Sequence, residues 1–386
     1  MEPAVPASDS PGPEGGAGAT DPVLPEFARS VAAIVPALLG VEDASWLPHP
    51  VHGSRSVVLL VVDGLGWRAF DDVPDALTAL RDFDGFAITT VLPATTASAL
   101  TSITTGTAPG THGLLGFRMR YDDVVLNNLR WQTEPRRSPT PDPEWVQRRP
   151  PFRGRSVPVV AKAEHEGSGF SVAHLRGADF VGWREPNDIV DHCARLVAQD
   201  APFVYAYYPG VDEIAHEFGL RDGAYAHELT GADALIGRLR NALPTDCALV
   251  VTADHGQVHL EPDAWVELGA ELLTLVDQQA GDARCRFLYA RSGAARDLAS
   301  ACRERFGTMA WVATRRELLD LGAFGPLAVG SIAGRIGDIV LMPRTDVGFV
   351  DPALLRETGL RSAHGAPTQA EMQVPLLAAR GTRRPA

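Results

Sequence analysis

Two uninterrupted apolar runs, each followed by an acidic residue, constrain the fold of this 386-residue chain more than any other feature. The run VVLLVV begins at Val57 and leads into Asp63, and CALVVTA begins at Cys247 and leads into Asp254 and His255. Continuous apolar runs of this length are typical of strands buried on both faces of a parallel sheet. Because ligands bind outside the carboxyl ends of such strands, we expect both acidic segments to lie at one edge of the sheet.

Shorter segments between these two runs alternate between strand-like and helix-like patterns. Residues 156–160, 171–175 and 203–208 are predicted strands, and residues 187–199 and 224–243 are predicted helices. Repeated strand–helix units of this kind predict an α/β fold around a mostly parallel sheet.

The composition divides the chain into a tail, a core and an insertion. Residues 1–25 mix Pro, Gly, Ser, Ala and acidic residues without periodicity, so we expect a disordered tail. Residues 265–334 depart from the core pattern and contain their own strand-like and helix-like segments, which indicates an inserted α+β subdomain. The expected core comprises residues 26–264 and 335–386, and the strand-like DIVLMPR that begins at Asp338 is assigned to it.

The net charge of −13 argues against a nucleic-acid-binding surface and favours an enzyme that meets an anionic substrate with local cations. We expect no membrane association and no export, because no segment is long enough to span a bilayer and the N-terminus lacks a basic region followed by an apolar stretch. The four cysteines form no CxxC pair, and Cys247 begins a buried strand. Reduced thiols and a cytoplasmic location are therefore expected, and the sequence sets no oligomeric state.

Acids and histidines in four separated segments are candidate metal ligands. They are Asp63, the pair Asp212 and His216, the pair Asp254 and His255, and His364. Asp212 and His216 are four residues apart, which in a helix brings them to one face in a pairing suited to a divalent metal. The alternatives are an exposed helix start for this pair, a turn or helix cap for Asp63, and a solvated loop histidine for His364. The pair after the second apolar run needs partners, because unpaired charge is costly to bury.

The segment PATTASALTSITTGTAPGTHG supplies hydroxyl groups at a turn that opens a helix of small residues. The start of such a helix presents backbone N–H groups to an anion. A threonine hydroxyl in this position can be a nucleophile where a base or a metal activates it. The alternative is that Thr95, Thr96 and Ser98 only cap the helix.

The ordered motifs VVDG, TTASALTSITTGTAPGTHG, DEIAH, TADHG and HG resemble the alkaline phosphatase superfamily, and its nucleotide pyrophosphatase/phosphodiesterase branch in particular. The resemblance extends from about Val57 to Leu377 and implies a three-layer α/β/α sandwich with two divalent metal ions. The implied ligands are Asp63, Thr96, Asp254 and His255 for one metal, and Asp212, His216 and His364 for the other. Three imidazoles and three carboxylates suit zinc better than magnesium or calcium, with manganese or iron as alternatives.

The same resemblance assigns two further roles. The nucleophilic threonine of the family lies ten residues before the glycine of a T-G turn and sixteen before a His-Gly, and counting back from Gly106 and His112 gives Thr96 both times, in preference to Thr95. Family phosphodiesterases have an Asn shortly after the His-Gly that binds a phosphate oxygen. Here Phe117 stands near that position and is the predicted substrate contact.

The resemblance therefore implies a phosphoric ester hydrolase, a phosphodiesterase or nucleotide pyrophosphatase that forms a phospho-threonine on Thr96 from a small-molecule ester. A phosphomonoesterase or a phosphonate hydrolase on the same core is the alternative. A monoesterase needs an added cation beside the phosphate, and no Lys or Arg occurs between Thr89 and Phe117. This favours a diester or pyrophosphate, unless Arg118 or Arg120 turns inward.

A remote alternative is an NAD-dependent oxidoreductase, because VVLLVVDGLGWRA contains GxGxxA directly after a strand. Against it, Asp63 would lie beside the pyrophosphate of the dinucleotide and repel it. Asp84, about twenty residues further on, also precedes the strand GFAITTV instead of following one.

Overall fold

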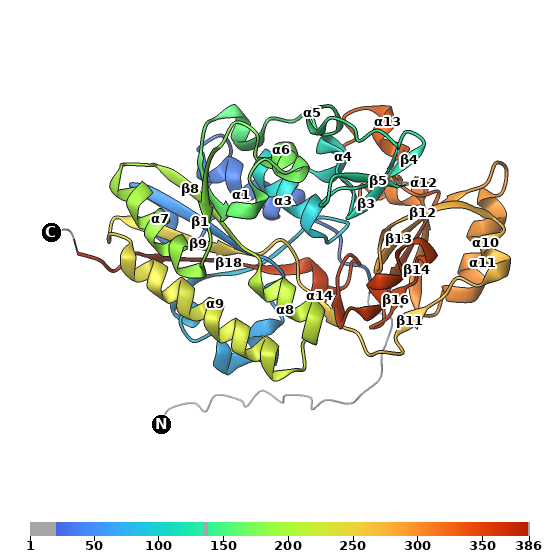
Figure 1. Cartoon of the computed structure of the whole chain (residues 1–386). Helices are drawn as coiled ribbons and strands as arrows, with labels where there is room; N and C mark the ends of the chain where they lie inside the picture. The colour runs from blue at the N-terminus through green and yellow to red at the C-terminus, as the bar shows by residue number, and fades with distance from the viewer. Residues whose placement is uncertain (1–20, 135–137, 385–386) are drawn as a thin grey trace, which may run out of the picture.

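The computed structural model describes residues 21–134 and 138–384, and its largest element is a seven-stranded sheet (Figure 1). In spatial order its strands are β2 (Asp84–Thr89), β18 (Gln373–Arg380), β9 (Cys247–Thr252), β1 (Ser56–Val62), β8 (Phe203–Tyr208), β6 (Pro158–Lys162) and β7 (Asp179–Trp183). The strands from β9 to β7 are parallel, whereas β18 is antiparallel to both of its neighbours. The expected mostly parallel sheet is confirmed.

The central strands end at one level of the sheet. Every residue of β1, β8 and β9 is buried, which explains their continuous apolar sequences. In the register of the sheet Val62 pairs with Tyr208, and Val61 pairs with Thr252. The residues that follow these three strands therefore emerge side by side at the carboxyl edge.

Helices cover both faces of this sheet, which confirms the three-layer α/β/α arrangement. One group packs together above the sheet in Figure 1 and consists of α1 (Val31–Leu38), α3 (Thr96–Thr105) and α6 (Gly169–Leu175). A second group contains α9 (Gly223–Ala242), which contacts both α7 (Pro186–Ala198) and α8 (Gly210–Phe218). Figure 1 shows α8 and α9 below the sheet.

A second region, to the right in Figure 1, is built on a four-stranded antiparallel sheet. Its strands, in spatial order, are β12 (Val276–Asp282), β13 (Cys285–Ala290), β15 (Ile339–Pro343) and β14 (Ala310–Thr314). The helices α10 (Ala270–Leu273), α11 (Ala295–Phe306) and α12 (Arg315–Asp320) belong to the same stretch of chain. The sequence placed β15 in the core, and that assignment is wrong because β15 pairs with β13 and β14. All residues of β15 are buried, so its composition resembles that of a core strand.

Smaller elements connect these parts. A three-stranded sheet contains β3 (Arg118–Tyr121), β4 (Val124–Asn127) and β5 (Gln132–Glu134), and two strand pairs join β10 (Val258–His259) to β17 (Ser362–Ala363) and β11 (Trp265–Val266) to β16 (Gly348–Phe349). The short α-helices are α2 (Ala69–Asp72), α4 (Pro109–His112), α5 (Pro143–Val146), α13 (Gly330–Ala333) and α14 (Gln369–Met372). The 3-10 helices are η1 (Phe27–Arg29), η2 (His49–Val51), η3 (Pro74–Ala76), η4 (Leu80–Asp82), η5 (Pro151–Gly154), η6 (Ala163–His165) and η7 (Pro352–Gly359).

Two sequence predictions need correction. Residues 171–175 form the end of α6 rather than a strand, since Ser168 caps the helix by accepting a hydrogen bond from the Ser171 N–H at 3.2 Å. A five-residue apolar segment does not distinguish a strand from a buried helix. Residues 1–20 of the predicted tail lie outside the described residues. Residues 21–25 are described, and there Val23 donates a backbone hydrogen bond to the carbonyl group of Pro367.

The four cysteines, Cys193, Cys247, Cys285 and Cys302, are buried and form no disulfide. Within the described parts of the chain, no helix combines the length and the hydrophobicity needed to cross a membrane.

A buried ion pair joins the four-stranded sheet to the segment near the end of the chain. Arg284, between β12 and β13, donates from Nε and Nη2 to the two carboxylate oxygens of Glu371, each at 2.8 Å. Both side chains are fully buried. Glu371 also accepts the backbone N–H of Ala366 at 2.9 Å. This pair therefore fixes the loop that precedes α14.

Removing the charge of Glu371 tests this linkage. We expect Glu371→Gln to lower the free energy of unfolding by about 3–5 kcal/mol, because the Arg284 guanidinium stays buried without a counter-charge. The matched control is Glu261→Gln, in a solvent-exposed pair with Arg221, which should cost less than about 1 kcal/mol. Chemical denaturation of both variants measures the difference, and equal losses would contradict the assignment.

Candidate active site

The carboxyl edge of the large sheet brings the predicted ligands together. Asp63 directly follows β1, and Asp254 follows β9 after one intervening residue. The chain after β8 enters α8, whose helical spacing places Asp212 and His216 on one face. The remaining residues come from other segments, since Thr96 begins α3 and His364 follows β17.

The first cluster consists of Asp63, Asp254 and His255, all buried. His255 Nε2 lies 3.4 Å from Asp63 Oδ1 and 3.4 Å from Asp254 Oδ2. Thr96 Oγ1 lies 3.1 Å from the same nitrogen. The structure therefore places the predicted nucleophile beside the acids and histidine that the sequence grouped with it.

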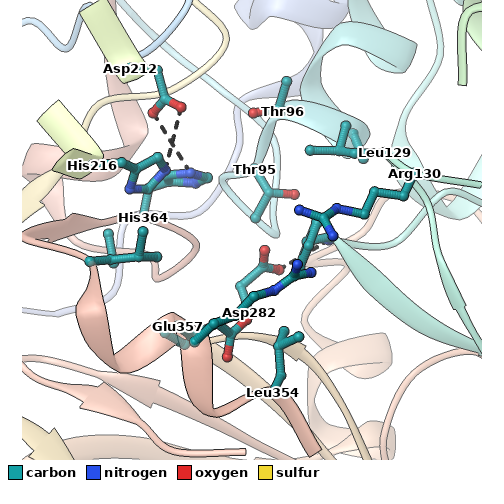
Figure 2. A pocket seen from close by; sticks show the side chains of 16 residues that line it. Thr95, Thr96, Leu129, Arg130, Asp212, His216, Asp282, Leu354, Glu357 and His364 are labelled. Carbon is teal, nitrogen blue, oxygen red and sulfur yellow. Dashed lines mark hydrogen bonds and ion pairs between the residues drawn. The ribbon is translucent and has the colours of Figure 1, made fainter. Parts of the chain in front are cut away.

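The second cluster consists of Asp212, His216 and His364 (Figure 2). Asp212 Oδ2 lies 3.3 Å from His216 Nε2, and Asp212 Oδ1 lies 3.9 Å from His364 Nε2. The two clusters adjoin, because the His364 ring stacks on the His255 ring with 3.6 Å between centroids. All seven predicted metal-site residues thus meet at one place.

In all three imidazoles the Nδ1 atom faces a backbone carbonyl oxygen. The Nδ1 atoms of His216 and His364 lie 2.9 Å from the carbonyl oxygens of Ser362 and Ala94, and His255 Nδ1 lies 3.2 Å from the carbonyl oxygen of its neighbour Gly256. An Nδ1–H that donates to a carbonyl leaves the Nε2 lone pair free for a metal, which is the usual support of a histidine ligand.

The pKa shifts of the residues in the two clusters also favour the binding of a cation. Burial, followed by the neighbouring imidazoles, lowers the pKa of His255 well below its usual value, and burial lowers that of His364 to about 4. Both rings are therefore neutral near pH 7. Burial, followed by the carboxylate of Asp212, raises the pKa of Asp254 to about 7, and burial and the two neighbouring carboxylates raise that of Asp63. A bound divalent cation would reverse this repulsion.

Three buried carboxylate oxygens of the clusters have no hydrogen-bond donor: Asp63 Oδ1, Asp212 Oδ1 and Asp254 Oδ2. The opposite oxygens of the first cluster are satisfied, since Tyr207 donates its hydroxyl to Asp63 Oδ2 and the backbone N–H of Gly64 donates to Asp254 Oδ1 at 3.1 Å. Unsatisfied buried anionic oxygens are costly unless a cation binds them. This donor set therefore fits two divalent metal ions.

The glycines after β1 allow close packing at the site. A Cβ at Gly64, where φ is +73°, would lie 2.3 Å from Gln257 Nε2 and 3.0 Å from Asp212 Cβ. A Cβ at Gly66 would lie 2.7 Å from the Cα of Gly256. The helix that follows is only four residues long. The GxGxxA pattern thus serves contacts between loops, and the arrangement lacks the long helix on which a dinucleotide-binding site depends.

The structure at the start of α3 tests whether Thr95 and Ser98 cap the helix. Thr95 occupies the N-cap position, yet its side chain makes no capping hydrogen bond, and its hydroxyl donates to Ser98 Oγ at 3.5 Å. Ser98 Oγ in turn accepts the backbone N–H of Gly116 at 2.7 Å. The capping interpretation therefore fails for Thr95, and Ser98 instead fixes the loop before Phe117.

Two cavities open beside Thr96, and both are also lined by Leu129 and Asp212. The larger has a volume of about 340 Å³, and its lining includes the three members of the second cluster together with Phe117, Arg130, Asp282, Arg356 and Glu357. The smaller has a volume of about 230 Å³, and its lining includes Asp63, Phe170, His174, Tyr205 and Tyr207.

Phe117, the predicted substrate contact, lines the larger cavity, whereas Arg118 and Arg120 do not. The backbone N–H of Phe117 donates to Asp282 at 3.2 Å. Arg118 is buried in ion pairs with Glu134 and Asp351, and the Arg120 guanidinium lies 4.1 Å from the centre of the Tyr289 ring. Both arginines are thus engaged away from Thr96.

Sequence reasoning assigned no individual role to three other residues of the site, although the segment from Arg118 to Trp131 was a candidate wall. Arg130 and Arg356 line the larger cavity from the β4–β5 loop and from η7. Tyr207, whose hydroxyl donates to Asp63, is the last residue but one of the buried strand β8, where a tyrosine resembles an ordinary core residue. No motif or spacing singles out these three residues.

Comparison with known proteins agrees with this geometry. No curated protein matches the sequence. Among solved structures, murine ectonucleotide pyrophosphatase/phosphodiesterase 5 is 16% identical with a TM-score of 0.63, and the match covers 86% of this chain and 88% of that chain. Phosphonoacetate hydrolase from Sinorhizobium meliloti 1021, in complex with phosphonoformate, is also 16% identical, with a TM-score of 0.60 and coverage of 85% and 91%. These similarities establish a shared fold.

The sequence model of the type I phosphodiesterase/nucleotide pyrophosphatase family matches residues 57–182 and 181–366. These two stretches include every predicted ligand and Thr96, and together they span well over half of the chain. This match contradicts the oxidoreductase alternative and identifies the chain as a phosphoester hydrolase of the alkaline phosphatase superfamily. The chain belongs to the type I phosphodiesterase/nucleotide pyrophosphatase family.

Proposed function

We propose that this protein is a metal-dependent phosphodiesterase or nucleotide pyrophosphatase in which Thr96 is the nucleophile. The observation that carries the proposal is the position of the Thr96 hydroxyl, 3.1 Å from His255 Nε2, where the two donor clusters and the two cavities meet. Asp63, Thr96, Asp254 and His255 would hold one metal ion, and Asp212, His216 and His364 the other. The mixture of imidazole and carboxylate ligands favours zinc.

When bound, the metal ions supply positive charge that lowers the pKa of the attacking hydroxyl and stabilises the leaving oxygen. The Thr96 oxygen attacks phosphorus, the bond to the leaving oxygen breaks, and a phospho-threonine forms. Water then cleaves this ester and restores the hydroxyl. Thr96 is the first residue of α3, and no side chain caps this helix, so the N–H groups of its first turn are available to the anionic phosphoryl oxygens.

The two cavities favour a diester or pyrophosphate over a monoester. A diester has two groups on phosphorus, and two cavities lined by Thr96 offer each group its own space. The burial of Arg118 and the stacking of Arg120 on Tyr289 also argue against a role as phosphate ligands for the two arginines that the sequence offered.

Metal content provides the first test. Protein purified without chelators should contain close to two divalent ions per chain, and Asp254→Ala should lose one of them together with activity, because it removes a ligand of the first cluster. Asp191→Ala, on the exposed side of α7, is the control and should keep both ions. Elemental analysis measures the ratio, and metal-free active wild-type protein would contradict the proposal.

Replacement of the adjacent threonines tests the nucleophile. Thr96→Ala should lower kcat/KM by about 10³-fold or more, because the attacking oxygen is lost. Thr95→Ala removes a hydroxyl one residue away and should lower it by less than about tenfold. Steady-state hydrolysis of bis-para-nitrophenyl phosphate measures both effects, and circular dichroism checks the fold. A larger loss in Thr95→Ala would move the nucleophile by one residue.

The ester preference is tested with three substrates. The ratio of kcat/KM for bis-para-nitrophenyl phosphate to that for para-nitrophenyl phosphate should exceed one, because both cavities are then used. A monoester preference of about tenfold, equal to about 1.4 kcal/mol of transition-state binding, would reverse this assignment. Faster turnover of phosphonoacetate than of either ester would favour a phosphonate hydrolase instead.

A further inference from the structure

We propose that the protein has a second binding site, separate from the active site, for a small organic molecule that combines a flat apolar part with two or more oxyanion groups. The site is a cavity lined by α4, by the β3–β4 hairpin, by α5 with the residues after it, and by the segment around α13. It shares no lining residue with either cavity beside Thr96. Its occupation is therefore independent of the reaction proposed for Thr96.

The cavity lies where segments of the predicted core and of the predicted insertion meet. The core contributes α4, the β3–β4 hairpin and α5, and the insertion contributes most of the lining between residues 328 and 335 (Figure 1). The volume is about 740 Å³, and sites for small molecules typically measure about 300–1,000 Å³. A concave site of this size favours a small ligand over the surface of another protein.

Four arginines line this cavity: Arg120, Arg148, Arg149 and Arg335. None of them forms an ion pair with a carboxylate of the described residues. The acidic residues of the described lining are Asp122 and Asp123, so four guanidinium groups stand against two carboxylates. In a chain whose net charge is −13, such a local excess of positive charge indicates an anionic ligand.

Arg335 is buried, with 9% of its surface exposed. Its Nη1 donates to the carbonyl oxygens of Gly113 at 2.6 Å and Val146 at 3.0 Å, and neutral carbonyl groups do not cancel the charge. Burial lowers the pKa of Arg335, Asp122 opposes this shift, and the positive charge of Arg148 adds to it. Because a guanidinium group stays protonated in proteins, its buried charge calls for a counter-ion. An oxyanion in the cavity would supply one.

The wall itself holds two of the four guanidinium groups in place. The two carbonyl groups fix Arg335, and the Arg120 guanidinium lies 4.1 Å from the centre of the Tyr289 ring, whose hydroxyl donates to the Arg335 carbonyl oxygen. Arg148 and Arg149 are adjacent and exposed. A guanidinium group donates two parallel hydrogen bonds to an oxyanion, and groups that are already positioned lose less freedom on binding. The site thus offers fixed and adaptable cations together.

An exposed aromatic side chain lines the same cavity. Trp145 is 67% exposed, more than any other large hydrophobic side chain of the described residues, and Val329 is 53% exposed. Val146 and Ile332 are buried parts of the lining. An indole exposed at a cavity provides a flat surface for stacking, and exposed apolar groups beside a cavity mark binding sites. These side chains therefore favour a ligand with a flat apolar part.

Titration calorimetry of metal-loaded protein with benzene-1,3,5-tricarboxylate tests the site. Arg148→Ala combined with Arg149→Ala should raise Kd by about tenfold or more, because two exposed guanidinium groups are lost while the buried residues stay. The matched control is Arg383→Ala combined with Arg384→Ala, which removes the same charge from two adjacent exposed arginines outside the cavity. Equal losses in both double variants would overturn the proposal, because net charge alone would explain them.

Two related probes separate charge from shape. Benzene-1,3,5-tricarboxamide has the same ring without charge, and propane-1,2,3-tricarboxylate has three carboxylates without the ring. Each should bind about tenfold more weakly than the aromatic tricarboxylate. Trp145→Leu should weaken binding of the aromatic tricarboxylate by about fivefold and that of the propane tricarboxylate by less than about twofold. Equal affinity for the tricarboxamide and the aromatic tricarboxylate would contradict an anion site.

A further pair of probes identifies the oxyanion. Benzene-1,3-dicarboxylate and benzene-1,3-diphosphonate differ only in their anionic groups, and both should lose affinity in the Arg148 and Arg149 double variant. The tighter of the two assigns the site to carboxylates or to phosphate-like groups. Unchanged affinity for both would overturn the proposal.

Inhibition kinetics separates this site from the active site. An anionic probe that binds the metal ions would inhibit hydrolysis of bis-para-nitrophenyl phosphate, and its inhibition constant should agree within about twofold between wild-type protein and the Arg148 and Arg149 double variant. Circular dichroism checks that the variant is folded. A rise of the inhibition constant equal to the rise of the calorimetric Kd would place the probe at the active site and overturn the proposal.

Discussion

The electrostatic repulsion among three carboxylates at one edge of a parallel sheet is the constraint on which the rest of the site depends. Asp63 and Asp254 follow the neighbouring strands β1 and β9, and Asp212 lies in the first turn of the helix that follows β8, the other neighbour of β1. Buried carboxylates this close are costly unless positive charge lies between them. Three imidazoles whose Nδ1 atoms face backbone carbonyl groups complete a ligand set suited to that charge, so the sheet topology brings together the groups that a metal site needs.

The second region of the molecule stabilises this arrangement from outside the large sheet. The Arg284–Glu371 pair fixes the loop that leads from His364 into α14. The strands β12 and β13 also bring Asp282 to the wall of the larger cavity, where its carboxylate fixes the backbone of Phe117. The four-stranded sheet therefore helps to shape the substrate side of the site. We propose that the insertion predicted at residues 265–334 contributes to specificity in this way.

Sequence patterns predicted the parts of the structure that depend on local chemistry. The apolar runs identified β1 and β9 because strands buried on both faces have few polar positions, and helical spacing put Asp212 and His216 on one face. The resemblance to the family then implied a grouping of the seven metal-site residues that agrees with the two clusters of the structure. The identity of the metal and the roles of these residues in catalysis stay predictions.

Other features depend on contacts between distant segments, which no local pattern encodes. The strand β15 resembles a core strand in composition, and only its pairing with β13 and β14 reveals its sheet. Residues 171–175 are apolar enough for a strand, but Ser168 upstream caps a helix. Arg130 and Arg356 are 226 positions apart in the numbering, and only the folded chain brings the β4–β5 loop and η7 to the wall of one cavity.

The most direct test of the central claim is identification of the residue that becomes phosphorylated. Metal-loaded protein turning over the para-nitrophenyl ester of thymidine 5′-monophosphate is quenched in acid, digested and analysed by mass spectrometry. The account predicts a thymidylyl adduct on the peptide that contains Thr96, with fragment ions that place it on Thr96 and not on Thr95. An adduct on any other side chain, or full turnover by protein in which Thr96 never bears one, would contradict it.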